Sequence, residues 1–170
     1  RQDEPDSRVV VVGRGLSAAQ LALAYLDSGA SVTLLQPSPP TIHLFDTNPG
    51  WLGSHYRQRF RRIRCPRQRR ELITQARYSG SVPPEAARAL RKAQEQRGLS
   101  LRTSYVTSAD WDQQTITLRT ASDAVVADRV VLATGFTREA PGGDWLQQLA
   151  GELGLPTSCC GFPRVDSALR

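Results

Sequence analysis

The feature that most constrains the fold is a run of valines followed by two closely spaced glycines. Residues 9–12 are all valine, and four consecutive β-branched residues predict a strand that is buried on both faces. Gly13 and Gly15 follow this strand, and an apolar pattern of helical period then begins at Leu16. The stretch therefore predicts a strand, a tight turn and a helix, with the spacing G-x-G-x-x-A ending at Ala18.

This spacing predicts a turn that can hold a pyrophosphate. Gly13 allows a turn that a Cβ would hinder, Gly15 lets the backbone approach a pyrophosphate closely, and Ala18 allows tight packing of helix on strand. The N–H groups at the start of the helix then face the phosphates, with the helix dipole behind them. The candidate cofactor-binding residues of this turn are Gly13, Arg14, Gly15, Leu16, Ser17 and Ala18. The alternative is a unit that packs well and binds no ligand.

The residues after the second predicted strand bear on the choice of cofactor. That strand covers residues 31–35 and is followed by Gln36, with Ser38 two positions further on. An Asp or Glu at this place would hold the ribose hydroxyls of NAD and repel the extra phosphate of NADP. Because no carboxylate is present, we expect NADP(H) to be bound, with its 2′-phosphate held by Arg14, by Ser38 or by the arginines of residues 57–62. The alternative for Ser38 is a simple turn hydroxyl.

The rest of the chain predicts further elements of an α/β fold. Two helices are expected at residues 66–80 and 83–98, the first burying Leu72, Ile73 and Ala76. The period then changes to two, which predicts a third parallel strand, three strands of a meander, and a last buried strand, at residues 99–102, 105–111, 115–120, 124–127 and 128–136. The expected fold is a Rossmann-like parallel sheet with helices on both faces and a three-stranded antiparallel meander.

Arginine dominates the charge of the chain. The net charge is +6, Lys92 is the only lysine, and eight arginines lie between Arg57 and Arg70. Three interpretations are open: a solvated helix face, a positive field that draws in a phosphate-rich ligand, and a nucleic-acid surface. The third is disfavoured because Phe60 is the only aromatic residue within this run.

Cysteine and histidine usage predicts no metal site and no disulfide framework. The three cysteines include the adjacent pair Cys159 and Cys160, for which we expect two ordinary thiols. His43 and His55 are expected to be structural or surface residues, and no catalytic residue is assigned. The cysteine usage favours a reducing, cytoplasmic location. No apolar run approaches the roughly 20 residues that span a bilayer, so we expect no membrane partner. The absence of methionine is typical of a segment of a longer protein.

Together these motifs resemble the NAD(P)-binding domain of two-dinucleotide flavoprotein oxidoreductases. Within that group the chain is most similar to flavin-dependent monooxygenases, including the lysine and ornithine N-hydroxylases, and to related bacterial FAD/NAD(P)-binding proteins. The family closes this domain with an "A-T-G" strand, which matches Ala133, Thr134 and Gly135. The resemblance covers about residues 8–136.

The resemblance implies a domain order, cofactors and a reaction. Residues 8–136 would be the NAD(P)-binding domain, and residues 137–170 a partial return segment toward a FAD-binding domain. NADP(H) would bind here and deliver hydride to FAD in the full-length protein, with Ala133, Thr134 and Gly135 close to the cofactors. The family's FAD-binding motif does not occur in this chain, so we expect the fragment alone to be inactive and its small-molecule substrate is not assigned. The alternatives are a structural or partner-binding module without cofactor, and a basic nucleic-acid-binding domain.

Overall fold

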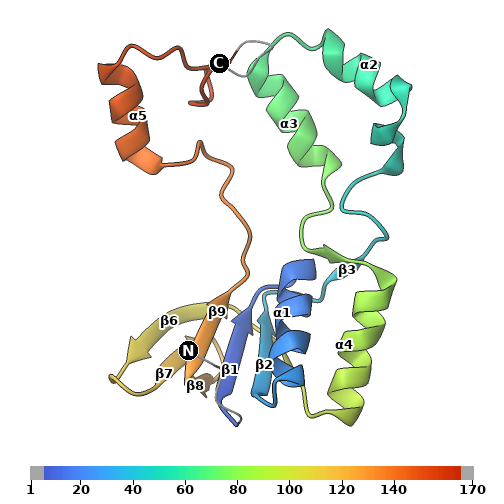
Figure 1. The fold of residues 1–170 in the computed structure, drawn as a ribbon, viewed down its shortest axis with the longest axis vertical. Coiled ribbons are helices and arrows are strands. Elements are labelled where there is room, and N and C mark those ends of the chain that lie inside the picture. Colours follow the sequence, from blue (N-terminus) through green and yellow to red (C-terminus); the bar gives the residue numbers. More distant parts are fainter. Residues whose placement is uncertain (1–5, 166–170) are drawn as a thin grey trace. The chain divides into compact units, whose positions relative to one another are not determined.

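The computed structural model describes residues 6–165, which form both helices and strands (Figure 1). In chain order the elements are β1 (Arg8–Val12), α1 (Leu16–Asp27), β2 (Ser31–Gln36), β3 (Thr41–Ile42), the 3-10 helix η1 (Pro49–Leu52), α2 (Ser54–Arg62), α3 (Pro66–Ala76), β4 (Ser81–Val82), α4 (Pro84–Gln96), β5 (Ser100–Thr103), β6 (Val106–Trp111), β7 (Ile116–Thr120), β8 (Ala124–Ala127), β9 (Arg129–Leu132) and α5 (Gly143–Glu152).

The central sheet is parallel and has the strand order β5-β2-β1-β9. Val11 of β1 pairs with Leu34 of β2 on one side and with Val131 of β9 on the other. The chain first moves outward from β1 to β2 and β5, and returns later to place β9 on the opposite side of β1. The direction of winding therefore reverses between β1 and β9, which is where ligands bind in open α/β sheets.

The two faces of this sheet are covered by different kinds of structure. Successive side chains of β1 point to opposite faces, so Val9 and Val11 pack in the core beneath α1 and α4, while Val10 packs in the core formed with the meander strands β7 and β8. Figure 1 shows α1 and α4 together on one side of the sheet. The α/β class with a parallel sheet and a three-stranded meander is thus confirmed, but in the described residues the meander covers the face where a second layer of helices was expected.

Small residues let α1 lie close to the sheet. Its fully buried positions are alanines, namely Ala18, Ala19 and Ala22. The helix ends in a Schellman motif, in which the N–H of Gly29 donates to the Leu26 carbonyl at 3.2 Å and the N–H of Ala30 donates to the Tyr25 carbonyl at 3.1 Å. Gly29 has a φ of 90°, which explains why this position ends the helix as expected.

The segment between β3 and α4 differs most from the expectation. The helix predicted over residues 66–80 ends at Ala76, none of its residues is buried, and Ile73 is 48% exposed. Gly80, at a φ of 71°, instead turns the chain into β4, which pairs in parallel with β3. The prediction was wrong about burial, because α3 belongs to Thr47–Arg77, a segment of a compact unit that contains none of the strands of the parallel sheet. The strands β3 and β4 were missed because two residues are too few to show a period.

Backbone contacts divide the chain into two compact units. The sheet unit extends to Asp46 and resumes over Tyr78–Gly135, so it holds the parallel sheet and the meander. The helical unit comprises Thr47–Arg77 and the chain from Phe136 onward, with η1, α2, α3 and α5. The division at residue 136 into two functional domains stays a prediction. None of the helices in the described part of the chain is both long and apolar enough to cross a bilayer.

Candidate functional site

The candidate site lies at the carboxyl ends of the parallel strands. The N–H of Gly13 donates to the Leu35 carbonyl at 2.9 Å, and the N–H of Ala133 donates to the Val12 carbonyl at 2.8 Å. These bonds hold the loops after β1, β2 and β9 at one edge of the sheet. The structure therefore brings the three predicted groups together, which are residues 13–18, 36–38 and 133–135.

Gly13 is the tightest point of this edge. Its φ is 152°, and a Cβ at this position would lie 2.3 Å from the Ala133 carbonyl oxygen and 3.0 Å from the Cβ of Ala18. The Ala133 carbonyl oxygen cannot move aside as a flexible side chain could, because it belongs to the backbone. Gly13 therefore permits the close approach of the β1 turn, α1 and the end of β9, which is the obstruction that the motif predicted.

Gly15 has a different role, because no atom crowds the position of its missing side chain. It is the N-cap of α1 with a φ of −86°, a conformation that any residue can adopt. A Cβ here would meet only the Cα of Gly80, at an ordinary contact distance of 3.6 Å. The bare backbone of Gly15 thus leaves room for a ligand, and replacing it with alanine would not disturb the packing.

The first turn of α1 presents unpaired amide donors. The first intrahelical bond runs from the N–H of Ala19 to the Gly15 carbonyl at 3.1 Å, so the N–H groups of Leu16, Ser17 and Ala18 have no acceptor within the helix. No side chain caps this end, and its first turn has no acidic residue. The positive end of the helix dipole is therefore not neutralised, which favours an anion such as a pyrophosphate.

Arg14 joins the loop after β1 to the loop after β2. Its Nη1 donates to the Ser38 Oγ at 2.7 Å, and its Nη2 donates to the Ser79 carbonyl at 2.9 Å. The side chain crosses Gly80, where a Cβ would lie 2.3 Å from the Arg14 Nε. Among the described residues no carboxylate forms an ion pair with Arg14, so its charge and its remaining N–H groups can serve an anionic ligand.

Gln36 closes β2 and is buried, with 7% of its surface exposed. Its backbone carbonyl accepts a hydrogen bond from the N–H of Ser104 at 2.9 Å, which ties the end of β2 to the chain after β5. The place where an NAD-binding site has a carboxylate is thus occupied by a neutral residue next to Ser38. The sequence analysis predicted Arg14 and Ser38 as separate candidates for holding the 2′-phosphate. It gave no sign of Ser79 or Gly80, because the helix was expected to run through both.

The remaining residues of the edge and the arginine run are placed differently. Ala133 packs against Gly13, whereas Thr134 and Gly135 are exposed. The arginines at residues 57–62 belong to the helical unit, while Arg14 and Ser38 meet within the sheet unit.

The histidines and cysteines have local contacts. His43 stacks on Tyr78 with ring centroids 4.0 Å apart. Cys159 and Cys160 are free thiols, and a hydrogen bond with Ser158, helped by Arg70, lowers the pKa of Cys160. Within residues 6–165 no three His, Cys, Asp or Glu side chains gather as a metal site would require.

Comparison with solved structures shows where this fold occurs. The chain is similar to the ornithine hydroxylase PvdA from Pseudomonas aeruginosa, with a TM-score of 0.63 and 18% identity over 86% of this chain and 40% of that one. It is also similar to the flavoprotein disulfide reductase RclA from Escherichia coli, with a TM-score of 0.56 and 13% identity over 98% of this chain and 29% of that one.

A third similar structure is an engineered water-forming NADPH oxidase bound to NADPH, a mutant of LbNOX, with a TM-score of 0.51 and 18% identity over 91% of this chain and 25% of that one. No protein-family model and no curated protein sequence matches the chain. The chain spans 40% or less of the three structures, and at these identities the likeness shows a common fold. This fold is the one that the sequence resemblance to flavoprotein oxidoreductases implied.

Proposed function

We propose that this chain is the NAD(P)H-binding part of a FAD-dependent oxidoreductase, that the intact protein is monooxygenase-like, and that NADPH is the preferred nicotinamide cofactor. The observation that carries the proposal is the uncapped start of α1 next to the Arg14–Ser38 pair, at the edge where the winding of the sheet reverses. The fold shared with an ornithine hydroxylase and a flavoprotein disulfide reductase supports it.

The residues at this edge fit a dinucleotide phosphate. The amides of Leu16, Ser17 and Ala18 would hold the pyrophosphate, because they are donors without intrahelical acceptors. Arg14 and the Ser38 hydroxyl would hold the 2′-phosphate, since a guanidinium binds phosphate through several charge-assisted hydrogen bonds. Bound NADPH would supply a hydride for a flavin in the longer protein. Ala133, Thr134 and Gly135 would lie beside the cofactor.

The oxidase structures give independent support for NADPH. The engineered oxidase bound to NADPH carries, among other changes, the replacement of an aspartate by alanine and of the following alanine by arginine. The parent enzyme from Lactobacillus brevis is bound to NADH. This chain likewise has no carboxylate at Gln36 or Ser38, and it supplies an arginine from its glycine-rich turn.

Calorimetric titration of the 170-residue chain with NADPH and NADH tests the proposal. We expect NADPH to bind at least about tenfold more tightly, because one charge-assisted hydrogen bond contributes about 1.5–3 kcal/mol and about 1.4 kcal/mol is a factor of ten. Binding of neither cofactor would instead support a structural module. Salt-sensitive binding of nucleic acid without dinucleotide binding would support a nucleic-acid-binding domain.

A substitution separates the role of Arg14 from general charge. We expect Arg14→Ala to weaken NADPH binding about 10- to 100-fold, from the loss of about 1.5–3 kcal/mol, and to change NADH binding less than about threefold. Arg91→Ala, an exposed arginine on α4, is the matched control and should leave both affinities within about twofold. Equal losses of NADPH and NADH affinity in Arg14→Ala would contradict the assignment of the 2′-phosphate site.

A further inference from the structure

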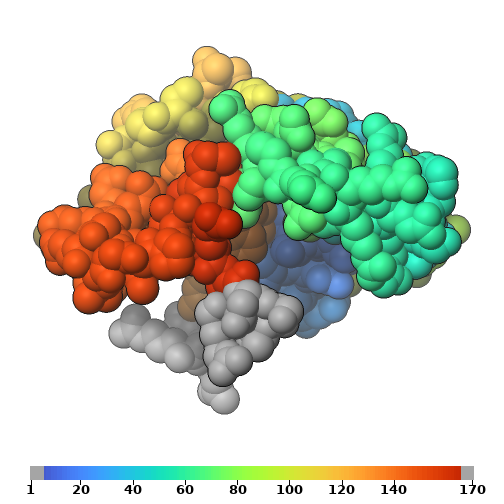
Figure 2. All heavy atoms as spheres, turned by 90° about the horizontal axis from the view of Figure 1, so that it is seen from above, coloured from blue at the N-terminus to red at the C-terminus, as the bar shows by residue number. Residues whose placement is uncertain are grey.

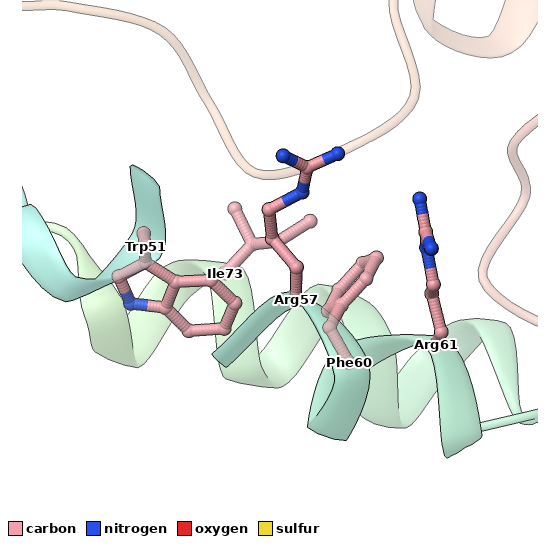
Figure 3. Close-up of a pocket in the computed structure, with 5 residues that line it drawn as sticks. All are labelled: Trp51, Arg57, Phe60, Arg61 and Ile73. Carbon is pink, nitrogen blue, oxygen red and sulfur yellow. The ribbon is translucent and has the colours of Figure 1, made fainter. Parts of the chain in front are cut away.

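A hollow lies in the helical unit, apart in sequence from the residues 13–18, 36–38 and 133–135 of the candidate dinucleotide site. It has a volume of about 230 Å³ and is lined by Trp51, Arg57, Phe60, Arg61 and Ile73 (Figure 3). These residues come from η1, α2 and α3, whose teal and green atoms lie at the molecular surface in Figure 2. We propose that this hollow binds a small organic anion with one flat aromatic ring, such as an aromatic carboxylate.

Aromatic and aliphatic side chains form the wall of the hollow. The rings of Trp51 and Phe60 are 6.1 Å apart at 82°, an edge-to-face arrangement. Ile73 approaches from α3 and is 48% exposed. An exposed apolar side chain beside two aromatic rings offers a surface on which another ring can pack with a gain from the hydrophobic effect.

Local contacts hold this wall in place before any ligand arrives. The Asn48 side chain accepts a hydrogen bond from the backbone N–H of Gly50 at 2.8 Å, and the backbone N–H of Trp51 donates to the backbone carbonyl of Asn48 at 3.0 Å. Arg69 lies 5.3 Å from the centre of the Phe60 ring. A preformed wall lowers the entropic cost of binding a ligand.

Two guanidinium groups stand at the mouth of the hollow. Arg57 and Arg61 are four residues apart on α2, and Figure 3 shows both side chains projecting with Phe60 from the same side of the helix. Like charges at this spacing destabilise a helix, and α2 has no acidic residue to relieve them. An anion bound between them would remove this repulsion.

Three other arginines of the helical unit, all on α3, have partners within the protein. Arg67 pairs with Glu71 at 3.3 Å, Arg69 donates to the Ile63 carbonyl, and Arg70 lies over the Phe162 ring. In residues 6–165 no carboxylate pairs with either arginine at the mouth of the hollow. Arg57 and Arg61 line the hollow, so they are the arginines placed to bind a carboxylate there through charge-assisted hydrogen bonds.

The size and shape of the hollow select the ligand. Drug-sized ligands occupy pockets of about 300–1,000 Å³, so a hollow of about 230 Å³ suits a molecule of one ring with a short acidic group. A single-stranded nucleic acid needs several aromatic platforms along a groove, whereas Phe60 is the only aromatic residue in the arginine run. The observations therefore favour a small anion over a polyanion.

The fluorescence of Trp51 provides a direct test. The chain has three tryptophans, and Trp111 and Trp145 are 72% and 70% exposed. The double variant Trp111→Phe with Trp145→Phe should therefore stay folded and retain Trp51 as its only tryptophan. The probes are 4-nitrobenzoate and 4-nitrobenzamide, which share the quenching ring and differ in charge. We expect saturable quenching by 4-nitrobenzoate at a Kd at least about tenfold below that for 4-nitrobenzamide.

Charge-matched variants of the protein with Trp111→Phe and Trp145→Phe test whether Arg57 and Arg61 bind the carboxylate. Arg57→Gln with Arg61→Gln should bring the Kd values of the two probes within about twofold, while Arg59→Gln with Arg62→Gln, the same charge change on the same helix, should leave them unchanged. Ile73→Glu is a second variant at an exposed position and should abolish binding of 4-nitrobenzoate by like-charge repulsion.

Three results would overturn the proposal. The first is an equal Kd for the two probes in the parent protein. The second is an equal loss of 4-nitrobenzoate affinity in the Arg59/Arg62 and Arg57/Arg61 variants, which would indicate a diffuse effect of charge. The third is displacement of 4-nitrobenzoate by an oligonucleotide whose own affinity for the protein falls equally in both pairs of variants. That result would identify a polyanion surface.

Discussion

Substitution of the two motif glycines by alanine should change the free energy of unfolding by very different amounts, although the glycines lie only two residues apart. Gly13→Ala places a Cβ 2.3 Å from the Ala133 carbonyl oxygen and 3.0 Å from the Ala18 Cβ, in a residue whose φ is 152°. Gly15→Ala places a Cβ at an ordinary contact distance from Gly80, at a φ of −86°. The first change should therefore destabilise the fold, and the second should be tolerated.

The expected magnitudes follow from these contacts. For Gly13→Ala, the unfavourable backbone conformation costs about 1–3 kcal/mol, and forcing a methyl group against a backbone carbonyl costs about another 1–3 kcal/mol. The total of about 2–6 kcal/mol is a large part of the 5–15 kcal/mol that stabilises a typical domain. For Gly15→Ala the loss should be about 1 kcal/mol or less, because alanine is a poorer N-cap than glycine.

Urea unfolding followed by circular dichroism at 222 nm measures both free energies of unfolding. We expect a clearly lower midpoint for Gly13→Ala and a midpoint close to that of the parent chain for Gly15→Ala. A loss below about 1 kcal/mol in Gly13→Ala would refute the argument that this turn is closed by backbone atoms. An equal loss in both variants would show that the two glycines do not have the separate roles described above.

Three further predictions concern the cofactor site and the dependence of stability on pH. Gly15→Val should abolish dinucleotide binding in calorimetry while the circular dichroism spectrum is retained, since the side chain would occupy the space of the pyrophosphate; unchanged NADPH affinity would count against the site. Gln36→Asp should weaken NADPH more than NADH, and equal losses would argue against NADP(H). Hydrogen bonds from Arg8 lower the pKa of Asp128 from 3.8 to about 2, so the stability that this pair contributes is present above pH 3.8 and is lost as the pH falls through about 2. The urea midpoints of the parent chain and Asp128→Asn should therefore differ at pH 6 and converge toward pH 2, and a constant difference would contradict the shift.

Much of the sheet unit was predictable because its signals are local. The valines of β1, the two motif glycines and the alanines of α1 lie within one short stretch, so the strand, the turn and the helix are all encoded by near neighbours. The ends of the meander strands were predicted within one residue at each boundary, and burial alternates with a period of two along β8. The close packing of α1 on the sheet was predicted from the small size of Ala18, which is fully buried.

The helical unit was predicted less well, because periodicity does not reveal whether a helix has anything to pack against. Leu72, Ile73 and Ala76 have the spacing of a buried face, yet no residue of α3 is buried. An apolar pattern indicates which face could be buried. Whether that face is covered depends on the elements that the fold places beside it.

The candidate site also combines features that could be predicted from consecutive residues with contacts that could not. The bare turn and the unpaired amides at the start of α1 could be predicted from residues 13–18, since a glycine-rich turn and a helix terminus are properties of consecutive residues. The contacts of Arg14 could not, because they join it to Ser38 and Ser79, which are 24 and 65 positions away. They exist because parallel strands gather their carboxyl ends at one edge and because Gly80 leaves the guanidinium a path across the chain. Folding in three dimensions thus determines which charged group meets a bound phosphate, whereas the local sequence determines that there is a place for one.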